Sequence, residues 1–139
     1  MIRPSAALLA LALALGGCAS TASYDPVGSM AEGVQADDMD LLAGAAVEMV
    51  RKHAKAKSGT IGLQSAGDDV FTPRLVDGLS KAGYSVVDGD RLRYQVGPFG
   101  EHLMLRVSID GTDASQIYGR DKKGKLAPIG PLSVWSVEQ

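Results

Sequence analysis

The spacing of apolar residues changes near Tyr84, and no other feature of the sequence constrains the fold as strongly. Before this point two segments repeat apolar residues at helical spacing, whereas after it apolar and polar residues alternate, as is typical of strands. The clearest alternation is in residues 103–109, where four aliphatic residues alternate with three others. Helices followed by a run of strands predict an α+β fold, with two helices packed on one face of a mainly antiparallel sheet of about five or six strands.

Charges and glycines place the two predicted helices. The first spans residues 37–57 and carries acidic residues at its start and basic residues at its end, which complements the helix dipole. The second spans about residues 69–82 and ends at Gly83, and Gly78 within it is expected to allow close packing against the sheet. The predicted strands are residues 60–64, 84–87, 91–96, 103–109, 114–120 and 133–137.

The start of the chain has the three parts of an export signal. Arg3 supplies a positive charge, residues 6–15 are all Ala or Leu, and small residues precede the only cysteine. The apolar run is shorter than the roughly 20 residues that a membrane-spanning helix needs. Its end, Leu15-Gly16-Gly17-Cys18, resembles the lipobox of bacterial lipoproteins. This resemblance implies that the thiol of Cys18 is acylated and that Cys18 begins the mature chain.

A lipoprotein signal divides the chain into three predicted parts. Residues 1–17 are the signal peptide, residues 18–36 are the lipidated cysteine and a flexible linker, and residues 37–139 are a periplasmic α+β domain. Several acyl chains on one cysteine anchor a protein stably, and Ala19 lacks the aspartate that retains lipoproteins in the inner membrane, so the outer membrane is favoured. Two alternatives stay open: ordinary cleavage that leaves the thiol unmodified, and a docking role for residues 24–27 of the linker.

Residue types that carry out catalysis or bind metals are sparse. The two histidines, His53 and His102, lie in different predicted elements, His53 as a solvated residue at the end of a helix, and acylation of Cys18 would leave no thiol. Asp68 and Asp69 are interpreted as charges at a helix N-terminus. We therefore expect no catalytic residue, no metal site, no cofactor apart from the covalent lipid on Cys18, and no enzyme activity. The net charge of −2 gives no reason to expect direct nucleic-acid binding.

The strand residues that point away from the helices suggest a docking surface. Arg91, Arg93 and Arg106 would form a cationic patch on the open face of the sheet. Tyr118 and Trp135 are residue types that act as anchors in protein interfaces. A second interpretation of the arginines is that charged residues on exposed strands prevent aggregation at the sheet edge. The five residues together are the predicted partner-docking set.

The order of segments resembles the conjugal-transfer lipoprotein family TrbH. Besides the lipobox, the matching segments are residues 37–57, 60–64, 75–86, 92–94, 103–109, 117–120 and 126–130, followed by Trp135. The resemblance covers nearly all of the mature chain.

This resemblance implies a subunit of a conjugative type IV secretion, or mating-pair formation, system. Such an outer-membrane lipoprotein would anchor and dock other channel subunits during plasmid DNA transfer, without catalysis. Its implied partners are membrane lipid, through acylated Cys18, and other secretion-channel subunits. Several copies of the chain could also form a homo-oligomer within a ring. The alternative is an envelope lipoprotein that regulates a periplasmic cell-wall enzyme through the same sheet face.

Overall fold

The computed structural model describes residues 28–29, 34–64 and 70–136. The predicted signal peptide, Cys18 and the Asp68–Asp69 pair lie outside the described residues. The described part has two helices, α1 (Ala36–His53) and α2 (Thr72–Lys81). Its strands are β1 (Gly28–Ser29), β2 (Gly59–Leu63), β3 (Tyr84–Asp88), β4 (Leu92–Phe99), β5 (His102–Ile109), β6 (Thr112–Arg120) and β7 (Leu126–Ser136).

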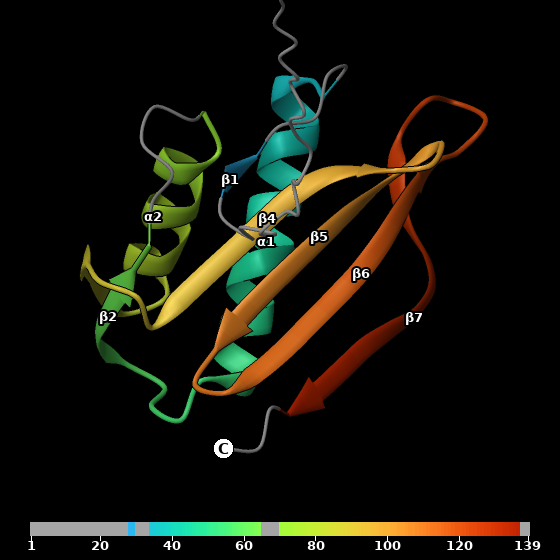
Figure 1. The fold of residues 1–139 in the computed structure, drawn as a ribbon. Coiled ribbons are helices and arrows are strands. Elements are labelled where there is room, and N and C mark those ends of the chain that lie inside the picture. The colour runs from blue at the N-terminus through green and yellow to red at the C-terminus, as the bar shows by residue number, and fades with distance from the viewer. Residues whose placement is uncertain (1–27, 30–33, 65–69, 137–139) are drawn as a thin grey trace, which may run out of the picture.

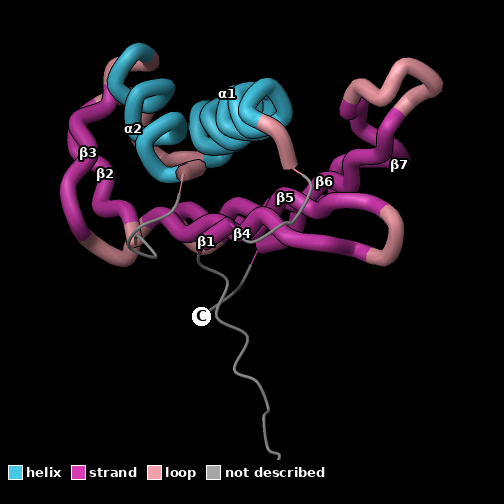
Figure 2. The backbone as a smooth tube through the Cα atoms, turned by 90° about the horizontal axis from the view of Figure 1, so that it is seen from above, coloured by secondary structure: helices cyan, strands magenta, loops and turns pink. Residues whose placement is uncertain are grey.

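The described elements form two layers. The strands make one sheet in the order β3-β2-β4-β5-β6-β7, and β1 pairs with β4 beside this path. Figure 2 shows both helices on the same side of the sheet, with α1 over its middle and α2 beside β2 and β3. Strands β4 to β7 are antiparallel neighbours. This arrangement confirms the predicted α+β class and the predicted placement of both helices on one face.

The turn between β5 and β6 follows the sequence signal closely. Asp110 has a φ of 52° and Gly111 a φ of 82°. Two consecutive residues with positive φ are what a two-residue hairpin of the favoured twist requires, and Asp-Gly is a preferred pair there. The following strands are therefore in the register that the alternation predicts, with Val107 opposite Ala114.

Strands β1 and β2 join the sheet in parallel, which the sequence pattern did not indicate. Helix α2 connects β2 to β3, and a crossover of this kind makes the two strands parallel neighbours. The turn before β4 passes very close to β2, because a Cβ atom added to Gly89 would lie 2.7 Å from the Cα atom of Gly62. Strand β2 meets β4 only at Leu92, and β1 pairs farther along, so two residues of the predicted linker belong to the sheet.

Helix α1 begins one residue before the predicted start and ends four residues before the predicted end. At its start, a carboxylate oxygen of Asp38 accepts a hydrogen bond from the backbone N–H of Gln35, at 3.0 Å. At its end, the ammonium group of Lys57 donates to the carbonyl oxygen of Arg51, at 2.7 Å. Lys57 thus satisfies the last turn from outside the helix instead of extending it, which is a common role for basic residues at helix C-termini.

The tight packing at Gly78 is against α1 and not against the sheet, so the predicted reason for this glycine was wrong. A Cβ atom at Gly78 would lie 2.8 Å from a methyl carbon of Val47. Helix α2 starts at Thr72, later than predicted, and places Pro73 in its first turn, where the missing N–H has no cost. The glycine allows the two helices to approach each other closely while both cover the sheet.

The hydrophobic core lies between the two helices and the central strands. Phe71 and Tyr94 are both buried, and their ring centres are 5.2 Å apart. The hydroxyl group of Tyr94 is hydrogen-bonded to Thr72 at the start of α2, so the polar end of this buried ring has a partner. The other fully buried side chains include Leu42, Val50, Leu75, Leu79, Leu92, Val96, Leu105, Val107 and Ile109. Among the described helices, none has the length and apolar character needed to cross a membrane.

Strand β7 is longer than predicted. The expected strand began at residue 133, whereas the structure begins the strand at Leu126 and includes Pro128 and Pro131 in it. Strand β7 is the last strand of the sheet, in red in Figure 1, and pairs with β6 alone. Proline is tolerated in an edge strand because its missing N–H can face away from the ladder.

Candidate functional site

Arg91 holds together one end of the sheet. Its guanidinium group binds both carboxylate oxygens of Asp110, at 2.6 and 2.9 Å, and donates to the carbonyl oxygen of Thr60, at 2.9 Å. Asp110 also accepts the backbone N–H of Lys55, just after α1, at 2.8 Å. The hydrogen bonds from Arg91 lower the pKa of Asp110 below its usual value. Arg91 therefore joins β2, β4, the hairpin turn and α1, and its charge is compensated.

Arg106 and Trp135 lie together on the outer face, by which we mean the sheet face turned away from the helices. The guanidinium carbon of Arg106 is 5.6 Å from the ring centre of Trp135. A guanidinium nitrogen of Arg106 binds a carboxylate oxygen of Asp113 at 2.8 Å. Burial alone would raise the pKa of Asp113, but hydrogen bonds from Arg106 and Ser108 outweigh it and lower the pKa. The cluster is thus an ordered ion pair beside an exposed aromatic ring.

Arg93 completes the outer-face group, whereas Tyr118 does not belong to it. Arg93 is exposed opposite Ser108 and makes no ion pair with a described residue. Tyr118 alternates with the outer-face residues of β6, points to the helix side and is 5% exposed. Burial raises the pKa of Tyr118. Of the five predicted docking residues, the structure therefore brings Arg93, Arg106 and Trp135 together on one face.

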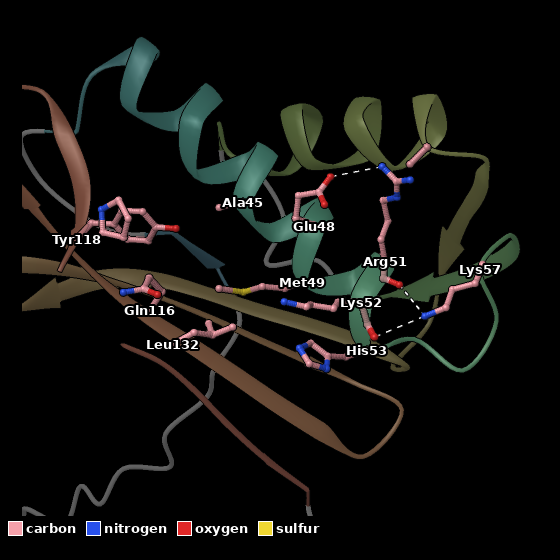
Figure 3. A pocket seen from close by; sticks show the side chains of 12 residues that line it. Ala45, Glu48, Met49, Arg51, Lys52, His53, Lys57, Gln116, Tyr118 and Leu132 are labelled. Atoms are coloured by element: carbon pink, nitrogen blue, oxygen red, sulfur yellow. Dashed lines mark hydrogen bonds and ion pairs between the residues drawn. The ribbon is translucent and has the colours of Figure 1, made fainter. Parts of the chain in front are cut away.

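A groove that the sequence analysis missed lies between α1 and strands β6 and β7 (Figure 3). Its volume is about 600 Å³. Helix α1 lies over β5 and α2 beside β3, and no described helix lies over β7 (Figure 2). The residues that line the groove include Ala45, Glu48, Met49, Lys52, His53, Gln116, Tyr118, Pro128 and Leu132.

The floor of the groove is held in place by Gln116. Its side-chain amide donates to the carbonyl oxygens of Ile129, at 3.1 Å, and Gly130, at 3.2 Å. The register between β6 and β7 shifts at this point, between Ser115 and Ile117. These hydrogen bonds replace regular ladder bonds across the irregularity, so the buried amide fixes the path of β7 along the groove.

His53 is not the fully solvated residue that the sequence pattern indicated. Its side chain is partly buried in the wall of the groove, and its Nε2 atom is buried without a hydrogen-bond partner among the described residues. The basic residues around it were correctly predicted to lie at the end of a helix, but periodicity alone gave no sign that β6 and β7 pass beside that end. A buried imidazole nitrogen without a partner is uncommon, since such groups are costly to leave unsatisfied.

Arg120 joins α1 to the β6–β7 hairpin. Its guanidinium group binds a carboxylate oxygen of Asp38 at 2.8 Å and donates to the carbonyl oxygen of Gly124 at 2.9 Å. The hydrogen bond from Arg120 lowers the pKa of Asp38. A second hollow of about 480 Å³, lined among others by His102 and Leu103, lies beside this pair. No cluster of His, Cys, Asp or Glu suited to a metal ion occurs within the described residues.

The lipobox residues Leu15, Gly16, Gly17 and Cys18 lie outside the described residues, so acylation of Cys18 stays a prediction.

Comparison with known proteins identifies the family. Neither the curated proteins nor the solved structures include a significant match to this chain. The family model described as conjugal transfer protein TrbH matches residues 21–138, which covers both helices and the whole sheet. The chain therefore belongs to the TrbH family of conjugal transfer proteins.

Proposed function

We propose that this protein is an outer-membrane lipoprotein subunit of a conjugative type IV secretion system. Acyl chains on Cys18 hold it at the periplasmic face of the membrane, where it anchors and docks other channel subunits during plasmid DNA transfer. The observation that carries the proposal is the family match over residues 21–138, and the lipobox at residues 15–18 agrees with it.

The outer face supplies a docking surface of suitable chemistry. Trp135 is 43% exposed, and Arg106, held by Asp113, lies against its ring. Aromatic and arginine side chains are the commonest anchors in protein interfaces, and an arginine already held in place loses little conformational entropy on binding. Arg93, beside them on β4, adds a cation whose charge no described residue pairs with. An acidic subunit surface would complement this group.

The lipid anchor is tested by labelling donor cells with radioactive palmitate. The full-length protein should incorporate label and fractionate with the outer membrane. Cys18→Ser should leave a precursor that incorporates no label, and mating efficiency should fall because this precursor cannot be anchored at the outer membrane by acyl chains. Cys18→Ser that supports wild-type mating efficiency would contradict the anchoring role.

The docking role is tested by pull-down of the lipidated protein from donor cells that carry the complete transfer system. Channel subunits should be recovered with it, and cross-linking should reveal whether several copies lie side by side in a ring. Recovery of none of these subunits, together with unchanged mating after deletion of the gene, would contradict the proposed function.

A further inference from the structure

The groove beside α1 continues into exposed apolar surface. Leu132 lines the groove and is 37% exposed, and Val134, which shares its side of the edge strand, is 45% exposed. Met49 and Ala45 supply the apolar wall on α1 (Figure 3). Exposed apolar side chains that gather beside a groove are typical of an interaction site. The volume of the groove, about 600 Å³, suits a few side chains of a partner.

The rim of the groove is basic although the chain as a whole carries a net charge of −2. Arg51, Lys52 and Lys57 line it together with one acidic residue, Glu48. Glu48 is paired with Arg51 at 3.4 Å, and Lys57 donates to the backbone at the end of α1. Lys52 is exposed and makes no ion pair with a described residue. The local charge therefore favours an acidic occupant.

The unpartnered Nε2 atom of His53 also favours an acidic occupant. It is buried in the groove wall below Lys52 and has no acceptor among the described residues. With a proton on this atom, the imidazole can donate one hydrogen bond. A turn of the imidazole toward the groove would expose this atom, and a carboxylate there would then accept the hydrogen bond and lie near the ammonium group of Lys52.

We propose that this groove binds a peptide segment of another protein in which an acidic residue lies next to large apolar residues. The carboxylate accepts a hydrogen bond from His53 and pairs with Lys52, while the apolar side chains pack between Met49 and Leu132. The inference rests on the proposed function only for the identity of the partner, which we take to be another subunit of the transfer channel.

Site-specific photo-cross-linking in donor cells tests the occupant. A photoreactive phenylalanine replaces Leu132 in the lipidated full-length protein, and the matched control replaces Val87, which is 48% exposed on β3 at the opposite edge of the sheet. The Leu132 variant should give an adduct that mass spectrometry maps to a segment of a different protein, with Asp or Glu within a few residues of the linked position. An adduct with a second copy, with residues 18–33 of the same chain or with phospholipid would overturn the proposal, and so would no adduct.

Charge reversal tests the chemistry. Lys52→Glu should lower the yield of the Leu132 adduct about tenfold, which corresponds to about 1.4 kcal/mol. Lys122→Glu makes the same charge change in the β6–β7 loop, away from the groove, and should leave the yield unchanged. Replacing the mapped acidic residue of the partner by Lys should restore the yield in the Lys52→Glu variant. An undiminished adduct in Lys52→Glu, with an unchanged thermal unfolding curve, would overturn the proposed recognition.

The two proposals can fail separately. If Cys18→Ser abolishes transfer while Leu132 gives no adduct, the groove proposal fails and the channel role stands. If Leu132 gives a charge-dependent adduct with a protein outside the transfer system, the groove proposal stands and the channel role fails.

Discussion

The two halves of the sheet differ in how they are covered. Strands β2 to β5 lie under the two helices and bury large side chains such as Leu92 and Leu105 completely. Strand β7 exposes most of its length, including Trp135, and its side toward the helices forms the wall of the groove. The covered half therefore supplies the stability of the domain, and the uncovered half is available for contacts.

The largest loss of stability should come from a substitution in the covered half of the sheet. Leu105→Ala removes a fully buried side chain under the helices and should lower the free energy of unfolding by about 2–5 kcal/mol, because it leaves a cavity. Urea-induced unfolding of the full chain measures this loss. Val134→Ala on the uncovered half is the matched control and should cost less than about 1 kcal/mol. Equal losses in both variants would contradict the division.

The second-largest loss of stability should come from replacing Arg91, which joins several elements at one end of the sheet. Arg91→Ala removes two charge-assisted hydrogen bonds to Asp110 and one to Thr60, and should cost about 2 kcal/mol in urea-induced unfolding. Arg93→Ala, two residues away on the outer face, should cost less than about 0.5 kcal/mol. A loss in Arg93→Ala as large as that in Arg91→Ala would show that both arginines serve the same role.

The ion pair between Arg91 and Asp110 should make the stability of the domain depend on pH. The pKa of Asp110 is lower in the folded protein than its unfolded value of about 3.9, so the pair contributes fully above that pH and its contribution is lost as the pH falls through the folded pKa. Asp38 and Asp113, whose pKa values are also lowered, add to this loss. Thermal melts between pH 7 and pH 2 should show a smaller decrease for Asp110→Asn than for the wild type. Parallel curves would mean that Asp110 does not contribute.

A smaller loss of stability is expected from a substitution at the contact between α1 and α2. Gly78→Ala places a methyl group against Val47 and should destabilise the domain by about 1 kcal/mol, because the crowding exceeds the gain in helix propensity. In a Val47→Ala background the crowding is absent, and Gly78→Ala should then stabilise. Chemical denaturation of the four variants gives the coupling directly. Additive effects would show that the helices have room to move apart.

The smallest effect on stability, with the clearest effect on binding, should come from the outer face. Arg93→Glu should change the melting temperature very little because the side chain is exposed, but it should lower the recovery of channel subunits in a pull-down. Lys125→Glu in the β6–β7 loop is the charge-matched control. Full recovery with Arg93→Glu would leave the arginines of this face with the alternative role of preventing aggregation at the sheet.

Some of the structure follows from the sequence alone. The change of spacing near Tyr84 determined the α+β class, because periods of 3.6 and 2 can each bury one face only in a helix or a strand. The pair Asp110-Gly111 determined the hairpin, since few residues tolerate positive φ at both positions. These are local properties, and a short stretch of chain carries them completely.

Other features depend on the tertiary structure. The carboxylates that pair with Arg91 and Arg106 come from other parts of the chain, Asp110 from a turn and Asp113 from β6. Two of the three charges in the cationic patch expected from alternation are therefore compensated. The groove and the burial of His53 arise because β6 and β7 continue past the edge of α1. Such contacts are set by the order of strands in the sheet and by where each helix lies, and the spacing of residues along the chain contains neither.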